Sequence, residues 1–345
     1  MEYINEINIT EAIIHILDNN SDEPILNEYS LDLNEETYNF LIKHIEKALK
    51  DEELRYAVFN EGRSIVKELS QEYLNGETDM LTVSKEMARQ LFILMKSNGK
   101  IPSCDLIFVS ISTEYGAMLG ILKMDYIKNY IHTVNFVDNK IGINIIPQLT
   151  GLPGSSQKLQ KCVFIKPIRE ELKFHLMVID KQSKSKESED YGSNYFIGSY
   201  LGCNIIDNDR DMTKNFVKAA EAWTRNHLKD DAHAAERARS TIKKTLKGEE
   251  IVDVKALSEN LFEDKKEVQK EFVEFITKQG VNENLTVDKR WVDKKLKRVR
   301  LKIDKDIDLY INEEAYDDTN RFEIHRNGDG SINMVIKHVM NYDEK

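Results

Sequence analysis

The chain has 345 residues, 41% of them hydrophobic and 32% charged, and its formal net charge at pH 7 is -11. This length allows about two domains with sizeable cores, and the negative balance argues against a protein that coats nucleic acid over its whole surface. The charge is uneven: residues 1–194 carry 21 basic and 30 acidic side chains, whereas residues 195–345 carry 28 and 30. A cationic surface is therefore expected in the second half.

The first third of the chain combines short strands with amphipathic helices. Apolar residues predict strands around residues 7–17 and 25–33. Asn34, followed by acidic residues, is typical of a capped helix start. Apolar residues at helical spacing predict two further helices at residues 63–74 and 83–96.

From Cys104 onward the hydrophobic pattern becomes that of strands. Six runs rich in β-branched and aromatic residues are separated by turn residues, as expected for an antiparallel meander. The runs are CDLIFVSIST, YGAMLGILKMD, YIHTVNFV, KIGINII, KCVFIKP and FHLMVID. The first half is therefore predicted to pack helices on an antiparallel sheet.

Residues 182–194 (QSKSKESEDYGSN) contain no aliphatic side chain and many charged ones. This composition is typical of a linker or a long loop. We therefore predict an α+β domain at residues 1–181 and a second domain at residues 195–345.

The second half is predicted to begin with helices and to end with strands. Helices are expected at residues 207–228, 231–247, 254–261 and 264–279, the last closed by Gly280. Strands are expected at residues 298–304 and 307–311, followed by a hairpin at 322–339 that turns at residues 327–330. The predicted fold class is α+β, with a helical segment followed by short strands and a hairpin in this half.

Three segments contain only part of a catalytic or ligand-binding motif. GLPGSSQK (151–158) lacks the GxxxxGK[ST] spacing of a phosphate loop, and FIGSYLGC (196–203) lacks the GxSxG order of a nucleophile elbow. DNDRD (207–211) is not followed by the glycine and the bidentate acid that a calcium loop needs. A turn, close backbone packing at the glycines, and helix capping by Asp207 or Asp209 account for them better.

The histidines and cysteines form no recognisable ligand pattern. His227 and His233 are six residues apart and so fall on different faces of a helix. Cys104, Cys162 and Cys203 are widely spaced and odd in number, which predicts buried core residues. No metal or other cofactor is expected.

A cytoplasmic protein without a membrane partner is expected. No apolar run in the sequence approaches the roughly 20 residues that cross a bilayer. The first residues, MEYINEINITEAIIHIL, lack the basic flank and cleavage site of a signal peptide.

The strongest candidate site is the cationic stretch KRWVDKKLKRVRLKIDK at residues 289–305, which has nine basic and two acidic residues. Residues 298–303 alternate between cationic and aliphatic side chains, so an extended strand would bury one face and align three cations on the other. Trp291 is a candidate stacking or wedging group. Such a row fits electrostatic binding to phosphates. The candidate DNA-binding residues are Lys289, Arg290, Trp291, Lys294, Lys295, Lys297, Arg298, Arg300 and Lys302.

The same stretch could instead be a solvated edge strand. Lysines on an edge strand block its pairing with the edge of another sheet. Residues 306–345 carry four basic and ten acidic groups, and these acids could neutralise the cationic stretch. A weaker basic surface at residues 225–247 either adds phosphate contacts or is an ordinary exposed helix. Its basic residues are Arg225, Lys229, Arg237, Arg239, Lys243, Lys244 and Lys247.

The order of several segments resembles a known family. The segments are YFIGSYLGCNIIDNDRDMTKNFVKAAEAW (195–223), ALSENLF (256–262), EFVEFITKQG (271–280), and a strand-rich end that includes LKIDKDIDLYI and FEIHRNGDGSINMVIKH. Over nearly the whole chain, these segments resemble the bacterial nucleoid-associated protein family whose members are about as long as this chain. The resemblance implies association with the nucleoid, DNA binding and a cytoplasmic location, and it supplies no catalytic residue.

These observations together predict a non-enzymatic, nucleoid-associated adaptor. The basic part of the second half would contact double-stranded DNA largely independently of sequence, and the acidic first half would bind a protein or mediate self-association. Two alternatives stay open. One is a protein-binding module at the nucleoid without DNA contact, and the other is an enzyme acting on nucleic acid whose site is assembled from distant residues.

Overall fold

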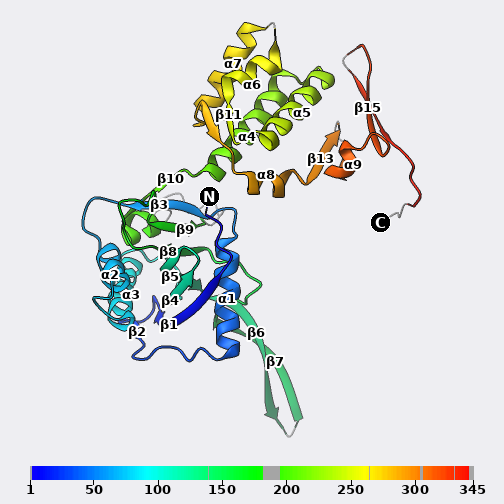
Figure 1. Cartoon of the computed structure of the whole chain (residues 1–345). Helices are drawn as coiled ribbons and strands as arrows, with labels where there is room; N and C mark the ends of the chain where they lie inside the picture. Colours follow the sequence, from blue (N-terminus) through cyan, green and yellow to red (C-terminus); the bar gives the residue numbers. More distant parts are fainter. Residues whose placement is uncertain are drawn as a thin grey trace. The chain divides into compact units, whose positions relative to one another are not determined.

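The computed structural model describes residues 2–138, 140–181, 195–263, 265–303, 306–329 and 331–341. The chain divides into two compact units, the first from residue 2 to residue 206 and the second from residue 207 onward. Figure 1 colours the first unit from blue to green and the second from green to red.

The division between the units falls later than the sequence predicts. Residues 182–194, the expected linker, lie outside the described residues. Residues 195–206 belong to the first unit rather than the second, because the strand Cys203–Ile206 pairs with the strand Arg55–Phe59. The backbone hydrogen bonds between these two strands set the boundary between the units, and the amino-acid composition does not reveal such bonds.

The first unit is built on an eight-stranded sheet in which every neighbouring pair is antiparallel. This arrangement confirms the predicted sheet type. In spatial order the strands are β10 (Cys203–Ile206), β3 (Arg55–Phe59), β9 (Leu176–Asp180), β8 (Lys161–Ile165), β5 (Gly116–Asp125), β4 (Cys104–Thr113), β1 (Ile7–Leu17) and β2 (Ile25–Leu26).

The predicted meander is interrupted by a hairpin. All six runs that follow residue 103 form strands, but β6 (Ile127–Val137) and β7 (Lys140–Gly151) pair with each other and not with the sheet. β5 and β8, which flank this insertion in the sequence, are neighbours in the sheet. Figure 1 shows the β6–β7 hairpin projecting away from the rest of the first unit.

Helices cover both sides of the sheet. They are α1 (Glu35–Leu49), α2 (Ile65–Leu74), α3 (Met80–Ser97) and the short π-helix η1 (Tyr195–Leu201). Asn34 caps α1 as predicted, because its side-chain oxygen accepts the N–H of Thr37 at 3.0 Å. In Figure 1, α2 and α3 lie on one side of the sheet and α1 on the other.

The main core of the first unit lies between the sheet and α3. Val83, Met87 and Leu91 of α3 are fully buried against sheet residues such as Phe108. All three cysteines are buried, as predicted, and burial raises the pKa of each thiol to about 12. The cysteines therefore act as small core residues.

The strand expected at residues 25–33 is much shorter than predicted. β2 ends at Leu26, and the next backbone N–H, that of Asn27, is accepted by Nδ1 of His15 at 3.0 Å. This side-chain bond takes the place of a ladder bond. β2 therefore ends at Leu26, before the residue whose N–H is bound by His15.

The described part of the second unit contains helices and three separate strand pairs. The helices are α4 (Asp209–His227), α5 (Ala232–Gly248), α6 (Val254–Phe262), α7 (Lys266–Lys278), α8 (Lys289–Leu296) and α9 (Glu313–Asp317). The pairs are β11 (Ile251–Asp253) with β12 (Asn284–Thr286), β13 (Arg298–Ile303) with β14 (Ile307–Asn312), and β15 (Phe322–Arg326) with β16 (Ile332–Ile336). The α+β class predicted from the sequence is confirmed.

Two details at helix starts in this unit differ from expectation. Asn208 caps α4, accepting the N–H of Asp211 at 3.0 Å, where Asp207 or Asp209 was expected. The helix α8 was not expected. It forms because Asp288 caps it, accepting the N–H of Trp291 at 2.9 Å.

No helix in the described part of the chain is long and apolar enough to span a membrane.

Candidate nucleic-acid interface

The predicted DNA-binding stretch is divided between two elements. Residues 289–296 form α8, whereas residues 298–303 form β13. The basic residues are therefore carried by a helix and a strand and not by one strand. The surroundings of each predicted residue depend on the element that carries it.

Two of the predicted residues face the interior of the unit. Trp291 is 9% exposed and packs in the core with Phe272 and Val292, so it is not placed to stack on a base. Lys289 is half-buried, and its ammonium group donates to the backbone oxygens of Leu246 and Lys247 at 3.0 and 2.8 Å. It stabilises the C-terminal end of α5, where lone carbonyl groups and the helix dipole favour a cation.

Four further cations lie on α8 or at its C-cap, Lys297. Lys294 and Lys297 are exposed, and so are Arg290 and Lys295, which interact with other groups of the chain. The exposed cations of α8 and its C-cap thus form a secondary basic surface.

The strand β13 has the alternation that the sequence predicts. Its residues are exposed and half-buried in turn, so Arg298, Arg300 and Lys302 point outward while the aliphatic side chains between them are only partly buried. The expected complete burial of the aliphatic face is not reached, because β13 has one partner strand, β14, and no larger sheet behind it.

The outer face of this strand pair also carries side chains from β14. Arg298 pairs with Asn312, Arg300 with Tyr310, and Lys302 with Asp308. Cross-strand partners project from the same face of a sheet. The cationic face therefore includes an exposed aromatic ring, because Tyr310 is 66% exposed.

Arg300 is the most constrained of the three cations on β13. Its guanidinium group lies 3.3 Å from a carboxylate oxygen of Asp308 and 5.1 Å from the ring centroid of Tyr310. Within the described residues, no ion pair engages Arg298 or Lys302. The latter two are therefore available to external anions.

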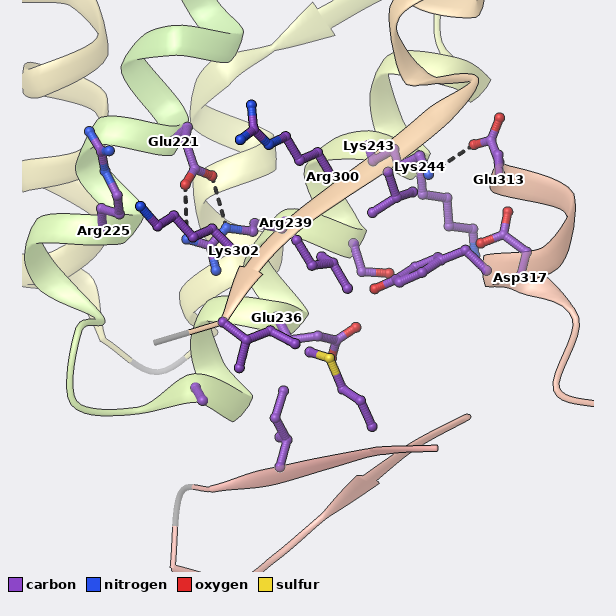
Figure 2. A pocket seen from close by; sticks show the side chains of 18 of the residues that line it. Glu221, Arg225, Glu236, Arg239, Lys243, Lys244, Arg300, Lys302, Glu313 and Asp317 are labelled. Atoms are coloured by element: carbon purple, nitrogen blue, oxygen red, sulfur yellow. Dashed lines mark hydrogen bonds and ion pairs between the residues drawn. The ribbon is translucent and has the colours of Figure 1, made fainter. Parts of the chain in front are cut away.

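β13 forms one wall of a groove of about 1540 Å³ whose other walls include α4 and α5. Figure 2 shows the labelled basic and acidic side chains around it. Arg300 and Lys302 line it together with basic side chains from the helices. The cationic strand and the weaker basic surface, separate in the sequence, thus belong to one site. The helical cations are Arg225, Arg239, Lys243, Lys244 and Lys247.

Some of the helical cations are neutralised inside the groove. Arg239 bonds Glu221 through two nitrogens, at 2.8 and 3.0 Å, and Figure 2 marks both bonds. Lys243 lies 2.9 Å from Glu313, and Lys247 pairs with the same carboxylate. Burial lowers the pKa of both lysines. Arg225 and Lys244 are exposed and remain the strongest candidates on the helical side.

The segments that resemble incomplete motifs have structural roles. In GLPGSSQK, Lys158 pairs with Asp51 at 3.0 Å and the oxygen of Pro153 lies 3.1 Å from Nε2 of His44. In FIGSYLGC, Gly202 adopts a φ of 64°, and a Cβ there would approach the side chain of Ser64 at 3.1 Å. Among the described residues, no group of three or more His, Cys, Asp or Glu side chains could hold a metal ion.

Tyr310 and Glu313 are among the site residues that sequence reasoning missed. Tyr310 is the exposed aromatic group, and Glu313 is the acid that neutralises the end of α5. Only three residues separate β13 from β14 in the sequence, so the alternation in residues 307–312 could have placed Tyr310 opposite an arginine. Nothing in the sequence indicates the pairing of Glu313, because its partners lie 66 to 70 residues earlier.

Comparison with known proteins supports the resemblance seen in the sequence. No curated protein matches the chain. A family model described as nucleoid-associated protein YejK matches residues 13–344, which is nearly the whole chain. Because the match covers both units, the chain belongs to this family of nucleoid-associated proteins, NA37.

Proposed function

We propose that the second unit binds the phosphate backbone of double-stranded DNA, largely without sequence preference, through the groove between β13 and the helices α4 and α5. The observation that carries this proposal is that Arg300 and Lys302 line one groove together with Arg225 and Lys244. Cations on long side chains gain affinity from phosphates by releasing counterions, and they read no base edges. Membership of a nucleoid-associated family supports a role at the nucleoid.

The first unit has a different role in this proposal. Its sequence, with 21 basic and 30 acidic residues up to position 194, would be repelled by DNA. We therefore assign it to contacts with protein. The whole chain would act as an adaptor that holds a protein surface near DNA and catalyses no reaction.

A second candidate function is protein binding at the nucleoid without DNA contact. It is favoured by the internal pairing of groove cations, since Arg239, Lys243, Lys247 and Arg300 all have acidic partners. Each such pair reduces the charge that a phosphate would meet. The two candidates differ in whether the purified protein binds DNA at all.

The test is a salt titration of DNA binding by the full chain. If about five cations reach phosphates, log affinity should fall against log salt with a slope of roughly -4.5, so that doubling the salt weakens binding about twentyfold. The combined variant Arg298→Gln, Arg300→Gln and Lys302→Gln removes two groove cations and the neighbouring cation on the same face of β13, and it should reduce the steepness of the slope by about 2.7. It should weaken binding to duplexes of different sequence alike.

A matched control removes the same charge elsewhere in the same unit. Lys255, Lys266 and Lys278 are exposed and do not line the groove, so their combined replacement by Gln should leave the slope unchanged. Equal effects of the two triple variants would show that only net charge matters and would refute the groove. Absence of salt-dependent DNA binding by the unaltered chain would favour the protein-binding candidate.

A further inference from the structure

The β6–β7 hairpin has two faces of different chemistry. Its register pairs Tyr130 with Pro147, Val134 with Ile143, and Phe136 with Ile141. Alternate pairs along a ribbon share a face. One face therefore carries Tyr130, His132, Val134, Phe136, Ile141, Ile143, Ile145 and Pro147, and the opposite face carries Ile131, Thr133, Asn135, Gly142, Asn144 and Ile146. We call the first set the arm face.

The apolar side chains of the arm face are exposed to solvent. Six of them have exposed fractions between 49% and 76%, which is far above the values of the buried sheet behind α3. They are Tyr130 63%, Val134 49%, Phe136 75%, Ile141 66%, Ile143 67% and Ile145 76%. Contiguous apolar surface of this kind is rare on soluble proteins and marks a contact site. The opposite face has two exposed isoleucines, Ile131 at 44% and Ile146 at 40%, among polar residues and a glycine, so the larger apolar surface lies on the arm face.

The composition of the arm face limits what can cover it. None of its residues is Lys, Arg, Asp or Glu, so it offers phosphates no cation and is unsuited to a nucleic-acid backbone. An apolar partner face of similar length is required. A projecting ribbon with a face that is apolar at seven of its eight positions fits a second ribbon of the same kind.

We infer that the arm face is a self-association surface, on which the β6–β7 hairpin of a second copy packs face to face. In a two-fold dimer, the same surface of each copy forms the contact. Val134 and Ile143 lie near the middle of the arm face, with the other apolar residues on either side of them. The inference concerns the first unit and does not rest on DNA binding by the second.

The available area is sufficient for a stable dimer. If the six exposed side chains are almost completely covered, at roughly 100 to 125 Å² each on average, the two faces together bury roughly 1,200 to 1,500 Å². This range matches the standard size of specific protein interfaces, about 1,200 to 2,000 Å². A contact made by one side chain alone would fall well short of it.

The first test measures the oligomeric state of the full chain without DNA, by sedimentation velocity over a range of micromolar concentrations. The unaltered chain should sediment as a dimer. The variant Phe136→Glu with Ile143→Glu should dissociate to a monomer, with self-association weakened at least a hundredfold, because four carboxylates would meet in the apolar contact. The matched control, Asn135→Glu with Asn144→Glu, adds the same charge to the opposite face and should remain a dimer.

A second measurement locates the contact. The native cysteines are all buried, so a cysteine introduced on the hairpin reacts selectively with a short bismaleimide. Val134→Cys, near the expected two-fold axis, should give a cross-linked dimer in high yield, and Asn135→Cys on the opposite face should give little. Unchanged thermal unfolding would show that these exposed substitutions leave the fold intact.

Several results would overturn the inference. A monomeric unaltered chain would mean that the arm face does not mediate self-association. A dimer that persists in the Phe136→Glu and Ile143→Glu variant would place the interface elsewhere. Equal cross-linking at positions 134 and 135 would rule out a face-to-face contact. None of these results depends on whether the second unit binds DNA.

Discussion

Arg300 and Tyr310 face each other on neighbouring strands, with the guanidinium carbon of Arg300 5.1 Å from the ring centroid of Tyr310. The ring favours the cation through its electron-rich face. It also supports an arginine that would otherwise move freely on an exposed strand. The position of the guanidinium group is therefore set by a cross-strand neighbour as well as by the nearby carboxylate of Asp308.

The first prediction concerns this pair. Tyr310→Ala should weaken DNA binding about two- to fivefold, because an exposed cation–π contact contributes about 0.5 to 1 kcal/mol. The slope of log affinity against log salt should hardly change, since the number of cations is the same. Fluorescence anisotropy at several salt concentrations measures both quantities. Tyr310→Phe is the control, because it keeps the ring and should bind like the unaltered chain; a loss as large as that of the alanine variant would contradict the stacking role.

The second prediction separates structural from DNA-binding cations on α8. Lys289→Gln should lower the free energy of unfolding by about 1 to 3 kcal/mol, because two carbonyl groups at the end of α5 lose a charged donor. Lys294→Gln, an exposed change of the same kind on the same helix, should alter stability by no more than about 0.5 kcal/mol. Urea denaturation measures both. Equal stabilities of the two variants would show that the Lys289 contacts contribute nothing.

The third prediction concerns the pH dependence of stability. Burial lowers the pKa of His15 to about 4, from an ordinary value of 6.5, with smaller contributions from Lys85 and Arg89. The imidazole is fully buried and lies 2.9 Å from the hydroxyl of Ser84. Between pH 6.5 and 4 the unfolded chain binds a proton at this site that the folded chain resists. Stability from this group is therefore complete above pH 6.5 and is lost as pH falls toward 4.

The loss attributable to His15 should reach about 3 kcal/mol near pH 4. The measurement is the free energy of unfolding as a function of pH for the unaltered chain and for His15→Gln. The variant should be less stable at pH 7 and should show a shallower decline between pH 6.5 and 4. Some decline should remain, because burial also lowers the pKa of His44 and His175. Parallel curves for the two proteins would exclude His15 as a source of the decline.

The sequence predicted features that depend on neighbouring residues. Helix starts such as Asn34, the helical segments of the second unit, and the outward row formed by Arg298, Arg300 and Lys302 all follow from local periodicity and capping. These features are set by backbone geometry over a few residues. They are therefore visible in the order of amino acids.

Other features depend on contacts between distant segments. A tryptophan within a basic run looks like a stacking group, but Trp291 is buried because α8 closes the core formed by the other helices. The hairpin β6–β7 has the same β-branched and aromatic pattern as the sheet strands. Its separation from the sheet depends on β5 and β8 pairing directly, which no local pattern specifies.

The sequence by itself determined that this protein has an α+β fold, an acidic first half and a cationic strand with its charges on one side. Only the tertiary structure decided which cations share a site, because Arg225 and Lys302 are 77 positions apart in the sequence and line the same groove only in the folded unit. It also decided which cations are neutralised. The reason is that the charge of a strand follows from its amino acids alone. The electrostatic potential at a site depends in addition on every charge that folding brings near it.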